Sequence, residues 1–385
     1  MFLRYRHMEI GLLGYGTVGK SFYELASESD NIQVKTLLSR RPRPELSCRI
    51  TPDIDDIIND DEIDTVVEVI GGIHPAYEYI SAALKAGKNV VSANKAVICA
   101  YYDEFLKLAL ENGVKLRYTA AAGGGIPWLE SLSRISRQDN VSGFEGILNG
   151  TTNFILSNMT DNGADYSECL KEAQRIGFAE ADPTADVEGY DARRKVVISA
   201  NIAFGVSVCE DEVPCIGITK ITAADIAAFS KAGLTVKLIG HAHRNDGSVS
   251  ACVEPMLFPE KAAPANIRDG YNIITLYADR VKTQSFTGLG AGGYPTGANV
   301  LADCISIDNG CGQVYTRKCE PVHIDNSAYL QCYYIRSKTL PGDIPVSKLL
   351  GAGIVTSPIS IKYAHNLYKQ ICIADPQAAM AAVKE

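Results

Sequence analysis

The chain has 385 residues, of which 46% are hydrophobic, and its formal net charge is −8 at pH 7. This length exceeds that of one typical domain and leaves ample apolar material for buried cores, so we expect two or three domains. The acidic balance, with no basic tract interleaved with aromatic residues, argues against nucleic acid or a membrane surface as a partner. An enzyme acting on a small molecule fits this composition.

Nothing in the chain predicts a membrane span or disulfide bonds. The longest apolar stretch, 196–208, has about 13 residues, whereas a transmembrane helix needs about 20. The opening MFLRYRH leads directly into a strand pattern and lacks the apolar core of a signal peptide. The 11 cysteines are scattered without any CxxC motif, which favours reduced thiols. We therefore expect a cytoplasmic protein.

The first motif along the chain is a glycine loop between a strand and a helix. MEIGLL has the pattern of a buried strand, and Gly14, Gly16 and Gly19 follow it in the spacing G-x-G-x-x-G. In this context the glycines allow a tight turn, approach of a pyrophosphate and close helix packing. The helix that follows, starting near Thr17 and Val18, offers amide donors to phosphates. The alternative is a simple turn, but the strand and helix context favours a dinucleotide.

The end of the second apolar segment, IQVKTLL, suggests which dinucleotide. A domain that prefers NAD usually has an acidic residue there, whereas this chain has Ser39, Arg40 and Arg41. Guanidinium groups bind a 2′-phosphate that a carboxylate would repel. The sequence therefore favours NADP over NAD, although the two arginines can also be read as solvated surface charge.

Alternating strands and helices continue to residue 95 and predict a parallel sheet. DTVVEVIGG reads as a strand that ends near Gly71, and a helical segment then leads to the strand NVVSA. Asn94 and Lys95 follow directly. Because such sheets bind ligands at the carboxyl ends of their strands, we expect Lys95 near the nicotinamide.

Three local patterns outside this region leave more than one interpretation. Asp191 and Lys195 lie four residues apart on a predicted helix, DARRKVVISANIAFG, as an ordinary surface ion pair or as one face of a cleft. In NGTTN, Thr151, Thr152 or Asn153 is expected to cap the helix of FILSNM. His241 and His243 share one face of a strand, but without a nearby cysteine or third histidine we interpret them as structural.

Six blocks together carry a family resemblance. They are GLLGYGTVG, SANK, AGGGIPWLESL, GILNGTTNFIL, GFAEADPTADVEGYDARRK and GLGAGGYPTGANVLAD. In this order and spacing, over about residues 8–312, the chain resembles homoserine dehydrogenase. The resemblance implies interconversion of L-homoserine and L-aspartate 4-semialdehyde with NADP(H) or NAD(H), in threonine and methionine biosynthesis. It also implies a homodimer or a dimer of dimers.

The resemblance implies roles for residues at matching positions. Lys195 and Lys95 match catalytic lysines, and Glu180 and Asp191 match acids that contact the substrate. From the i, i+4 spacing we also expect Asp191 to orient Lys195. One positioned acid/base group suffices in both directions, because the substrate oxygen loses a proton on oxidation and gains one on reduction. Burial disfavours an ammonium, so a lysine in a partly desolvated cleft suits this task. The expected substrate-binding residues are Glu180, for the α-ammonium group, together with Asp186, Asn149, Gly150, Thr151 and Thr152.

The resemblance also implies cofactor and cation sites. The residues expected to bind the cofactor are Gly14, Gly16, Thr17, Val18, Gly19, Arg40, Arg41, Gly71, Lys95, Gly290 and Gly292. In AAAGGGIP, the backbone carbonyls of Ala122, Gly124 and Ile126 match a sodium-binding loop. The family usually has a glutamate eight residues before the proline, where this chain has Thr119. A structural glycine turn is the alternative there.

The expected fold class is α/β with three regions. Residues 1–135, completed by about 288–318, are expected to form a Rossmann-type NAD(P)-binding domain. Residues 136–287 are expected to form an α+β substrate and dimerisation domain, in which LTVKLIGHAHRNDGSVSACVEPML is a hairpin. Residues 320–385 weakly resemble an ACT regulatory domain in degenerate form, which makes threonine inhibition a hypothesis. Within them we expect a strand, a Pro-Gly loop, a helix and another strand between residues 327 and 361.

Overall fold

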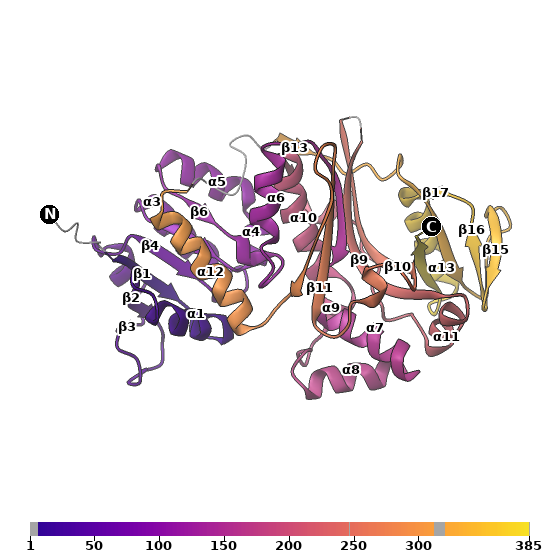
Figure 1. Cartoon of the computed structure of the whole chain (residues 1–385), viewed down its shortest axis with the longest axis horizontal. Helices are drawn as coiled ribbons and strands as arrows, with labels where there is room; N and C mark the ends of the chain where they lie inside the picture. Colours follow the sequence, from indigo (N-terminus) through magenta and orange to yellow (C-terminus); the bar gives the residue numbers. More distant parts are fainter. Residues whose placement is uncertain (1–6, 246, 312–319, 385) are drawn as a thin grey trace. The chain divides into compact units, whose positions relative to one another are not determined.

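The computed structural model describes residues 7–245, 247–311 and 320–384, and Figure 1 traces the chain through them. The chain divides into two compact units. Unit 1 has three segments: the described residues as far as Arg137, the segment Asn201–Ser207, and the described residues of Leu289–Glu320. Unit 2 consists of Gln138–Ala200, Val208–Gly288 and the described residues from Pro321 onward. The start MFLRYR and residues 312–318 of the expected domain completion lie outside the described residues. Among those described, no helix combines the length and apolar character needed to cross a bilayer.

Unit 1 is built on a parallel sheet with the strand order β3-β2-β1-β4-β5-β6. The apolar side chains of β1 and β4 pack against Phe22 of α1 and Val300 of α12 in one buried core, and the two helices touch through Gly293 and Gly297 (Figure 1). The predicted strands are present, and β3 and β6 were not predicted because two or three residues give no readable alternation. The strands are β1 Met8–Leu13, β2 Ile32–Leu38, β3 Arg49–Thr51, β4 Thr65–Glu68, β5 Asn89–Ser92 and β6 Leu116–Arg117.

Helices separate most of these strands, as a parallel sheet requires. They are α1 Thr17–Ser27, α2 Asp55–Ile58, α3 Ala76–Lys85, α4 Lys95–Ala100, α5 Tyr102–Glu111, η1 Thr119–Ala121, α6 Trp128–Ser136 and α12 Gly293–Asp308.

Unit 2 contains a ten-stranded mixed sheet whose main order is β12-β11-β7-β9-β10-β18-β14-β16-β15, with β17 paired to β14. The expected hairpin is confirmed, since β9 and β10 pair in antiparallel register from Leu234 to Pro259. The strands are β7 Val141–Ile147, β9 Leu234–Asn245, β10 Ser248–Pro259, β11 Tyr271–Ala278, β12 Lys282–Leu289, β14 Leu330–Arg336, β15 Val346–Leu350, β16 Gly353–Thr356, β17 Ile359–Ser360 and β18 Ala379–Val383.

The helices that lie wholly in unit 2 include the one that begins in the NGTTN motif. They are α7 Gly150–Asn162, α8 Tyr166–Arg175, α9 Thr184–Val187, α11 Ala223–Lys231 and α13 Ile361–Ala374, with short 3-10 turns η2 Glu210–Glu212 and η3 Pro264–Asn266. Three further elements run across a boundary between the units: α10 Tyr190–Phe204, β8 Val206–Val208 and β13 Glu320–Val322.

The C-terminal region differs from its sequence-based prediction. The helix expected between the Pro-Gly loop and the next strand is wrong, because Val346–Leu350 forms strand β15 and pairs with β16. Gly351, with φ of +57°, makes the turn between them, and a helix this short would gain little from hydrogen bonding. The helix of this region comes later, as α13, and β14, β16, β15 and β18 all belong to the sheet of unit 2.

Candidate functional site

Lys195 lies in the first half of α10 and is 7% exposed. Its Nζ donates to the backbone oxygen of Leu148 at 2.6 Å and to Asp191 Oδ2 at 2.7 Å. The Asp191 carboxylate is buried as well. The interpretation of this pair as an exposed surface ion pair is therefore wrong. An ammonium has three donors, and the described residues receive two of them.

Asn149 connects this pair to a second acidic residue. Its Nδ2 donates to Asp191 Oδ2 at 2.9 Å and to Asp186 Oδ1 at 2.7 Å. A single amide therefore holds two carboxylates in place beside Lys195. Asp186 lies on α9, and it is only partly buried.

Asn149 is also the N-cap of α7. Its Oδ1 accepts hydrogen bonds from the backbone N of Thr152 at 2.8 Å and from Thr152 Oγ1 at 3.0 Å. The expectation that Thr151, Thr152 or Asn153 caps this helix is wrong. Asn149 has an extended backbone from which its amide reaches the first turn, so the helix already begins at Gly150. The amide groups of this first turn form a donor set suited to a carboxylate.

The other predicted substrate residues differ in their surroundings. Thr151 Oγ1 donates to the backbone oxygen of Phe178 at 2.8 Å. Glu180 is exposed, and no described residue forms a hydrogen bond with its carboxylate. The structure thus brings together Lys195, Asp191, Asp186, Asn149 and Thr152, and it does not join Glu180 to that network.

The two arginines beside Lys195 have a separate partner. Arg193 Nη2 lies 3.0 Å from Glu210 Oε1, and Arg194 Nε lies 3.1 Å from the same oxygen. Three consecutive basic residues therefore serve two sites, since Lys195 pairs with Asp191 while Arg193 and Arg194 pair with Glu210.

The glycine loop of unit 1 has the close approaches that its spacing predicts. Gly14 has a φ of +103°, which favours glycine. A Cβ on Gly19 would lie 2.2 Å from the Gly14 oxygen, whereas a Cβ on Gly16 would meet nothing within 4 Å. Gly16 is the N-cap of α1 and gives no side-chain cap, and the first turn contains no acidic residue. The amide groups of Thr17 and Val18 are therefore suited to an anion.

Arginines gather after β2, as the sequence predicts. Arg40 and Arg41 are exposed, and the described residues give neither an ion-pair partner. Sequence reasoning missed Arg43, whose guanidinium carbon lies 5.1 Å from the ring centre of Tyr15 in the glycine loop. Its position two residues after Arg41 was the available signal.

A buried carboxylate that sequence reasoning missed holds the ends of β4 and β5. Glu68 accepts from Ser92 Oγ at 2.7 Å, from Asn94 Nδ2 at 3.3 Å, and from the backbone N of Ile70 at 2.8 Å and of Gly71 at 3.4 Å. Burial raises the pKa of Glu68. Asn94 caps α4, so this network fixes the helix start at which Lys95 stands.

The second glycine loop meets the predicted cation loop inside unit 1. A Cβ on Gly124 would lie 2.4 Å from the backbone carbon of Gly290. Gly292, with φ of +126°, is the N-cap of α12. Both glycines therefore stand where the backbone must approach closely or take a conformation that other residues avoid.

The cation loop already contains a donor. Asn299 Nδ2 donates to the backbone oxygens of Gly124 and Ile126, which are two of the three carbonyls expected to bind sodium. Thr119 supplies no carboxylate, and its backbone N donates to Asp303 at 2.8 Å. A sodium ion at this loop would therefore have to share both carbonyls with an amide donor.

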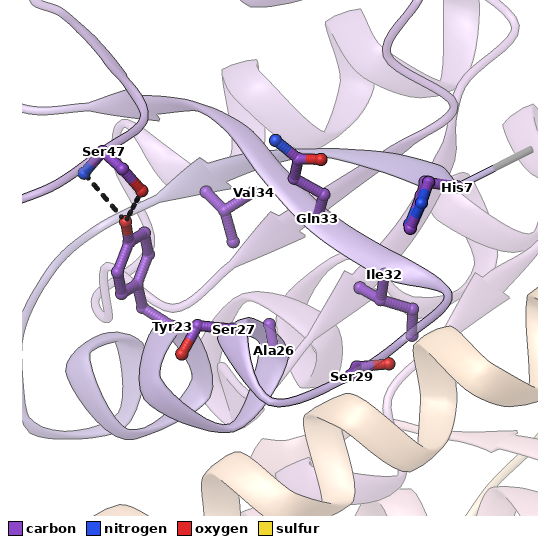
Figure 2. A pocket seen from close by; sticks show the side chains of 9 residues that line it. All are labelled: His7, Tyr23, Ala26, Ser27, Ser29, Ile32, Gln33, Val34 and Ser47. Atoms are coloured by element: carbon purple, nitrogen blue, oxygen red, sulfur yellow. Dashed lines mark hydrogen bonds between the residues drawn. The ribbon is translucent and has the colours of Figure 1, made fainter.

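Figure 2 shows a pocket lined by residues of α1, β2 and the adjoining loops, including Tyr23, Ser27, Ile32 and Ser47. Ile32 begins β2, so the pocket lies toward the amino end of that strand. Dinucleotides bind at the carboxyl ends of such sheets, so this pocket is a poor candidate for the cofactor site.

The interpretation of His241 as a histidine without nearby metal-binding partners is wrong. Cys252 Sγ lies 3.0 Å from His241 Nε2, and a third histidine, His365, lies 2.8 Å from Glu254. Strand pairing and a distant helix bring these residues together, which spacing along the chain does not reveal. His243 instead stacks on Tyr329, with ring centres 4.3 Å apart.

Comparison with known proteins settles the family. A model described as "Homoserine dehydrogenase" matches residues 127–305, and one described as "Homoserine dehydrogenase, NAD binding domain" matches residues 14–119. The homoserine dehydrogenase of Bacillus subtilis is 37% identical over 314 residues, covering 78% of this chain and 72% of that protein. That of Corynebacterium glutamicum is 42% identical over 317 residues, covering 77% and 71%. The chain belongs to the homoserine dehydrogenase family.

Solved structures agree with this assignment. The crystal structure of a homoserine dehydrogenase from Thiobacillus denitrificans has a TM-score of 0.91 and 29% identity, with 99% of each chain covered. The S. aureus homoserine dehydrogenase has a TM-score of 0.77 and 31% identity over 99% of this chain and 100% of that one. The protein is thus an NAD(P)-dependent oxidoreductase of amino-acid biosynthesis that interconverts L-homoserine and L-aspartate 4-semialdehyde.

Proposed function

We propose that Lys195 exchanges the proton of this reaction. The single observation that carries the proposal is the burial of Lys195 with its Nζ held by Asp191 and the Leu148 carbonyl. A bound nicotinamide would supply the hydride transfer between cofactor and substrate carbon. On oxidation the amine of Lys195 takes the hydroxyl proton, and on reduction its ammonium gives that proton to the oxygen. Asp191 holds the ammonium in position, and we assign the second catalytic lysine to Lys95.

The groups around Lys195 suit the amino-acid part of the substrate. We propose that Asp186 and Glu180 accept hydrogen bonds from the α-ammonium group, because a carboxylate is its natural partner. The start of α7, from Asn149 to Thr152, presents backbone donors to the α-carboxylate. Asp186 already meets Asn149, which supports a binding region shared by both substrate charges.

The test is homoserine-dependent reduction of NADP+ by the purified protein, alongside other amino alcohols. Lys195→Ala should lower turnover by about 100-fold to 10,000-fold, the usual value of a positioned acid/base group, while the affinity for NADP+ is little changed. Arg194→Ala is the matched control, since it removes the adjacent cation that pairs with Glu210. Near-normal turnover of Lys195→Ala would remove this lysine from the mechanism. Faster turnover of another amino alcohol than of homoserine would contradict homoserine as the substrate.

We also propose that NADP is preferred over NAD. Arg40 and Arg41 stand at the carboxyl end of β2, and Arg43 adds a third guanidinium beside the glycine loop. A hydrogen bond to a charged group contributes about 1.5–3 kcal/mol, so Arg41→Ala should raise KM for NADP+ by about 10-fold to 100-fold. The KM for NAD+ is the internal control. An equal rise for both cofactors would show that Arg41 does not read the 2′-phosphate.

Sodium at the loop of Ala122, Gly124 and Ile126 is a separate proposal with a simple test. Each carbonyl oxygen has two lone pairs, so an ion would bind beside the Asn299 amide. Replacing sodium with tetramethylammonium at constant ionic strength lowers the rate if the ion is required. An unchanged rate means that activity does not require sodium at this loop.

We further propose a cytoplasmic homodimer or dimer of dimers. Ten described cysteines are reduced thiols, which suits a reducing compartment. The sheet of unit 2 ends in β12 and β15, and edge strands are common places for a second copy to pair. Light scattering gives the mass in solution.

The ACT-like identity of residues 320–385 is a further hypothesis, and activity unchanged by millimolar threonine would reject inhibition through it.

A further inference from the structure

A second group of buried polar side chains lies in unit 2, in segments that supply none of the groups around Lys195. His241 on β9 stands directly opposite Cys252 on β10 in the antiparallel register. Glu254 lies two residues after Cys252 and so on the same face of the strand. His365 comes from α13, more than a hundred residues later in the chain. Nitrogen, sulfur and oxygen atoms from these elements converge at one place.

The distances suit a shared ion. Cys252 Sγ lies 3.0 Å and Glu254 Oε1 lies 3.4 Å from His241 Nε2. The donor atoms of His241, Cys252 and Glu254 all lie within 4.8 Å of one another. Ligands of a tetrahedral zinc ion, at about 2.0–2.3 Å from the metal, are separated by similar distances. Small side-chain movements would therefore place all three around one ion.

Two further side chains form hydrogen bonds with the Glu254 carboxylate. His365 Nε2 lies 2.8 Å from Glu254 Oε2, while Gln331 Nε2 donates to Oε1. Carboxylates that bind metals are usually held in this way by neighbours that do not touch the ion. His365 is thus placed to orient Glu254 while Oε1 faces His241 and Cys252.

Charge favours an ion here as well. Cys252 and Glu254 have no exposed surface and His241 is 1% exposed, so a net charge in this group would be costly. A divalent cation bound by one thiolate, one carboxylate and one neutral imidazole gives a total charge of zero. The thiolate and imidazole select a transition metal such as zinc over magnesium or calcium, which prefer oxygen ligands alone.

We propose that His241 Nε2, Cys252 Sγ and Glu254 bind a divalent transition-metal ion of the zinc class, with His365 as the residue that positions Glu254. On binding, the bond from the metal to sulfur forms as the Cys252 S–H bond breaks, and its proton leaves to the buffer. No oxidation or reduction takes place. Three protein ligands leave one tetrahedral position for a water molecule. All three ligands lie on the β9–β10 hairpin, and Glu254 connects them to His365 of α13.

The test uses the full chain expressed with added zinc. We expect close to one zinc per chain by elemental analysis, and the cobalt-substituted protein should show a thiolate-to-cobalt charge-transfer band. Cys252→Ser should lose that band. Cys169→Ser, the same change at another buried cysteine of unit 2, should keep it. A folded wild-type protein without bound zinc and without the band would overturn the proposal, as would a band that persists in Cys252→Ser.

A second measurement needs no variant and so remains decisive if Cys252→Ser does not fold. X-ray absorption of the zinc-loaded wild-type protein should require one sulfur at about 2.3 Å together with nitrogen or oxygen ligands at about 2.0–2.2 Å. A shell of nitrogen and oxygen alone would exclude Cys252 as a ligand. Neither readout depends on dehydrogenase activity, so the result is independent of the role proposed for Lys195.

Discussion

Unit 2 contains two buried polar clusters that differ in construction. The Lys195 cluster comes from the starts of α7 and α10, the loop before α7 and the short helix α9, and Lys195, Asp191 and Asn149 keep 5–7% exposure. The Glu254 cluster comes from two strands and a distant helix, and Glu254 and Cys252 have none. A group that reacts with a substrate must be reachable, whereas a sealed group can act only on the protein or on an ion held within it. Burial alone therefore does not identify a catalytic residue.

Among the variants that test this difference, Glu254→Gln should have the largest effect on stability. Removing the carboxylate leaves His241 and His365 without their buried partner, and breaking such a pair costs about 3–5 kcal/mol of stability. We expect lower stability in urea unfolding and unchanged turnover per folded molecule. Lys195→Ala should show the opposite pattern.

Glu212→Gln is the matched control for that variant. Glu212 also pairs with a histidine, His323, at 2.7 Å, but His323 is exposed. Exposed pairs contribute little, so this change should leave the unfolding curve almost unaltered. If Glu254→Gln also left stability unaltered, the two clusters would not differ as described.

The dependence of stability on pH should also distinguish the two clusters. Burial acts to raise the pKa of Glu254, but hydrogen bonds from His241 and His365 prevail and lower it from 4.5 to about 2. A lowered pKa in the folded state gives stability that is complete above the unfolded value of 4.5 and is lost as the pH falls toward 2. Between pH 6 and pH 3 the metal-free wild-type protein should therefore lose more stability than Glu254→Gln. Equal losses in urea titrations would contradict this origin of the shift.

The smallest effect concerns the other cluster. Asn149→Ala removes the N-cap of α7, which should cost about 0.5–2 kcal/mol, and it also removes the amide between Asp186 and Asp191. Turnover should fall as well. Ser360→Ala removes the cap of α13, where Ser360 Oγ accepts from the backbone N of Tyr363 at 3.2 Å, and it should lower stability alone. Equal turnover in the two variants would show that Asn149 acts only as a cap.

Local patterns predicted much of unit 1. The strand MEIGLL, the glycine loop and the helix after it could be read because each feature depends on neighbours within a few residues. The i, i+4 relation of Asp191 and Lys195 could be read for the same reason. The cap of α7 was predicted one turn too late, because several residues of NGTTN are good caps and only the backbone conformation selects Asn149.

Other features depend on contacts that no local pattern contains. Glu68 was missed because its partners follow a different strand, at Ser92 and Asn94. The helix predicted before residue 351 became β15 because pairing with β16 stabilises a strand there.

The family, the dinucleotide motif and the lysine expected to carry the proton could all be read from the sequence, since each depends on contiguous blocks of residues. Three features emerged only from the folded chain: Lys195 is buried, Arg193 and Arg194 pair with Glu210, and His241 contacts Cys252. Burial and long-range pairing depend on which segments pack together. Residue spacing along the chain fixes only what lies within a few turns of a helix or along one strand.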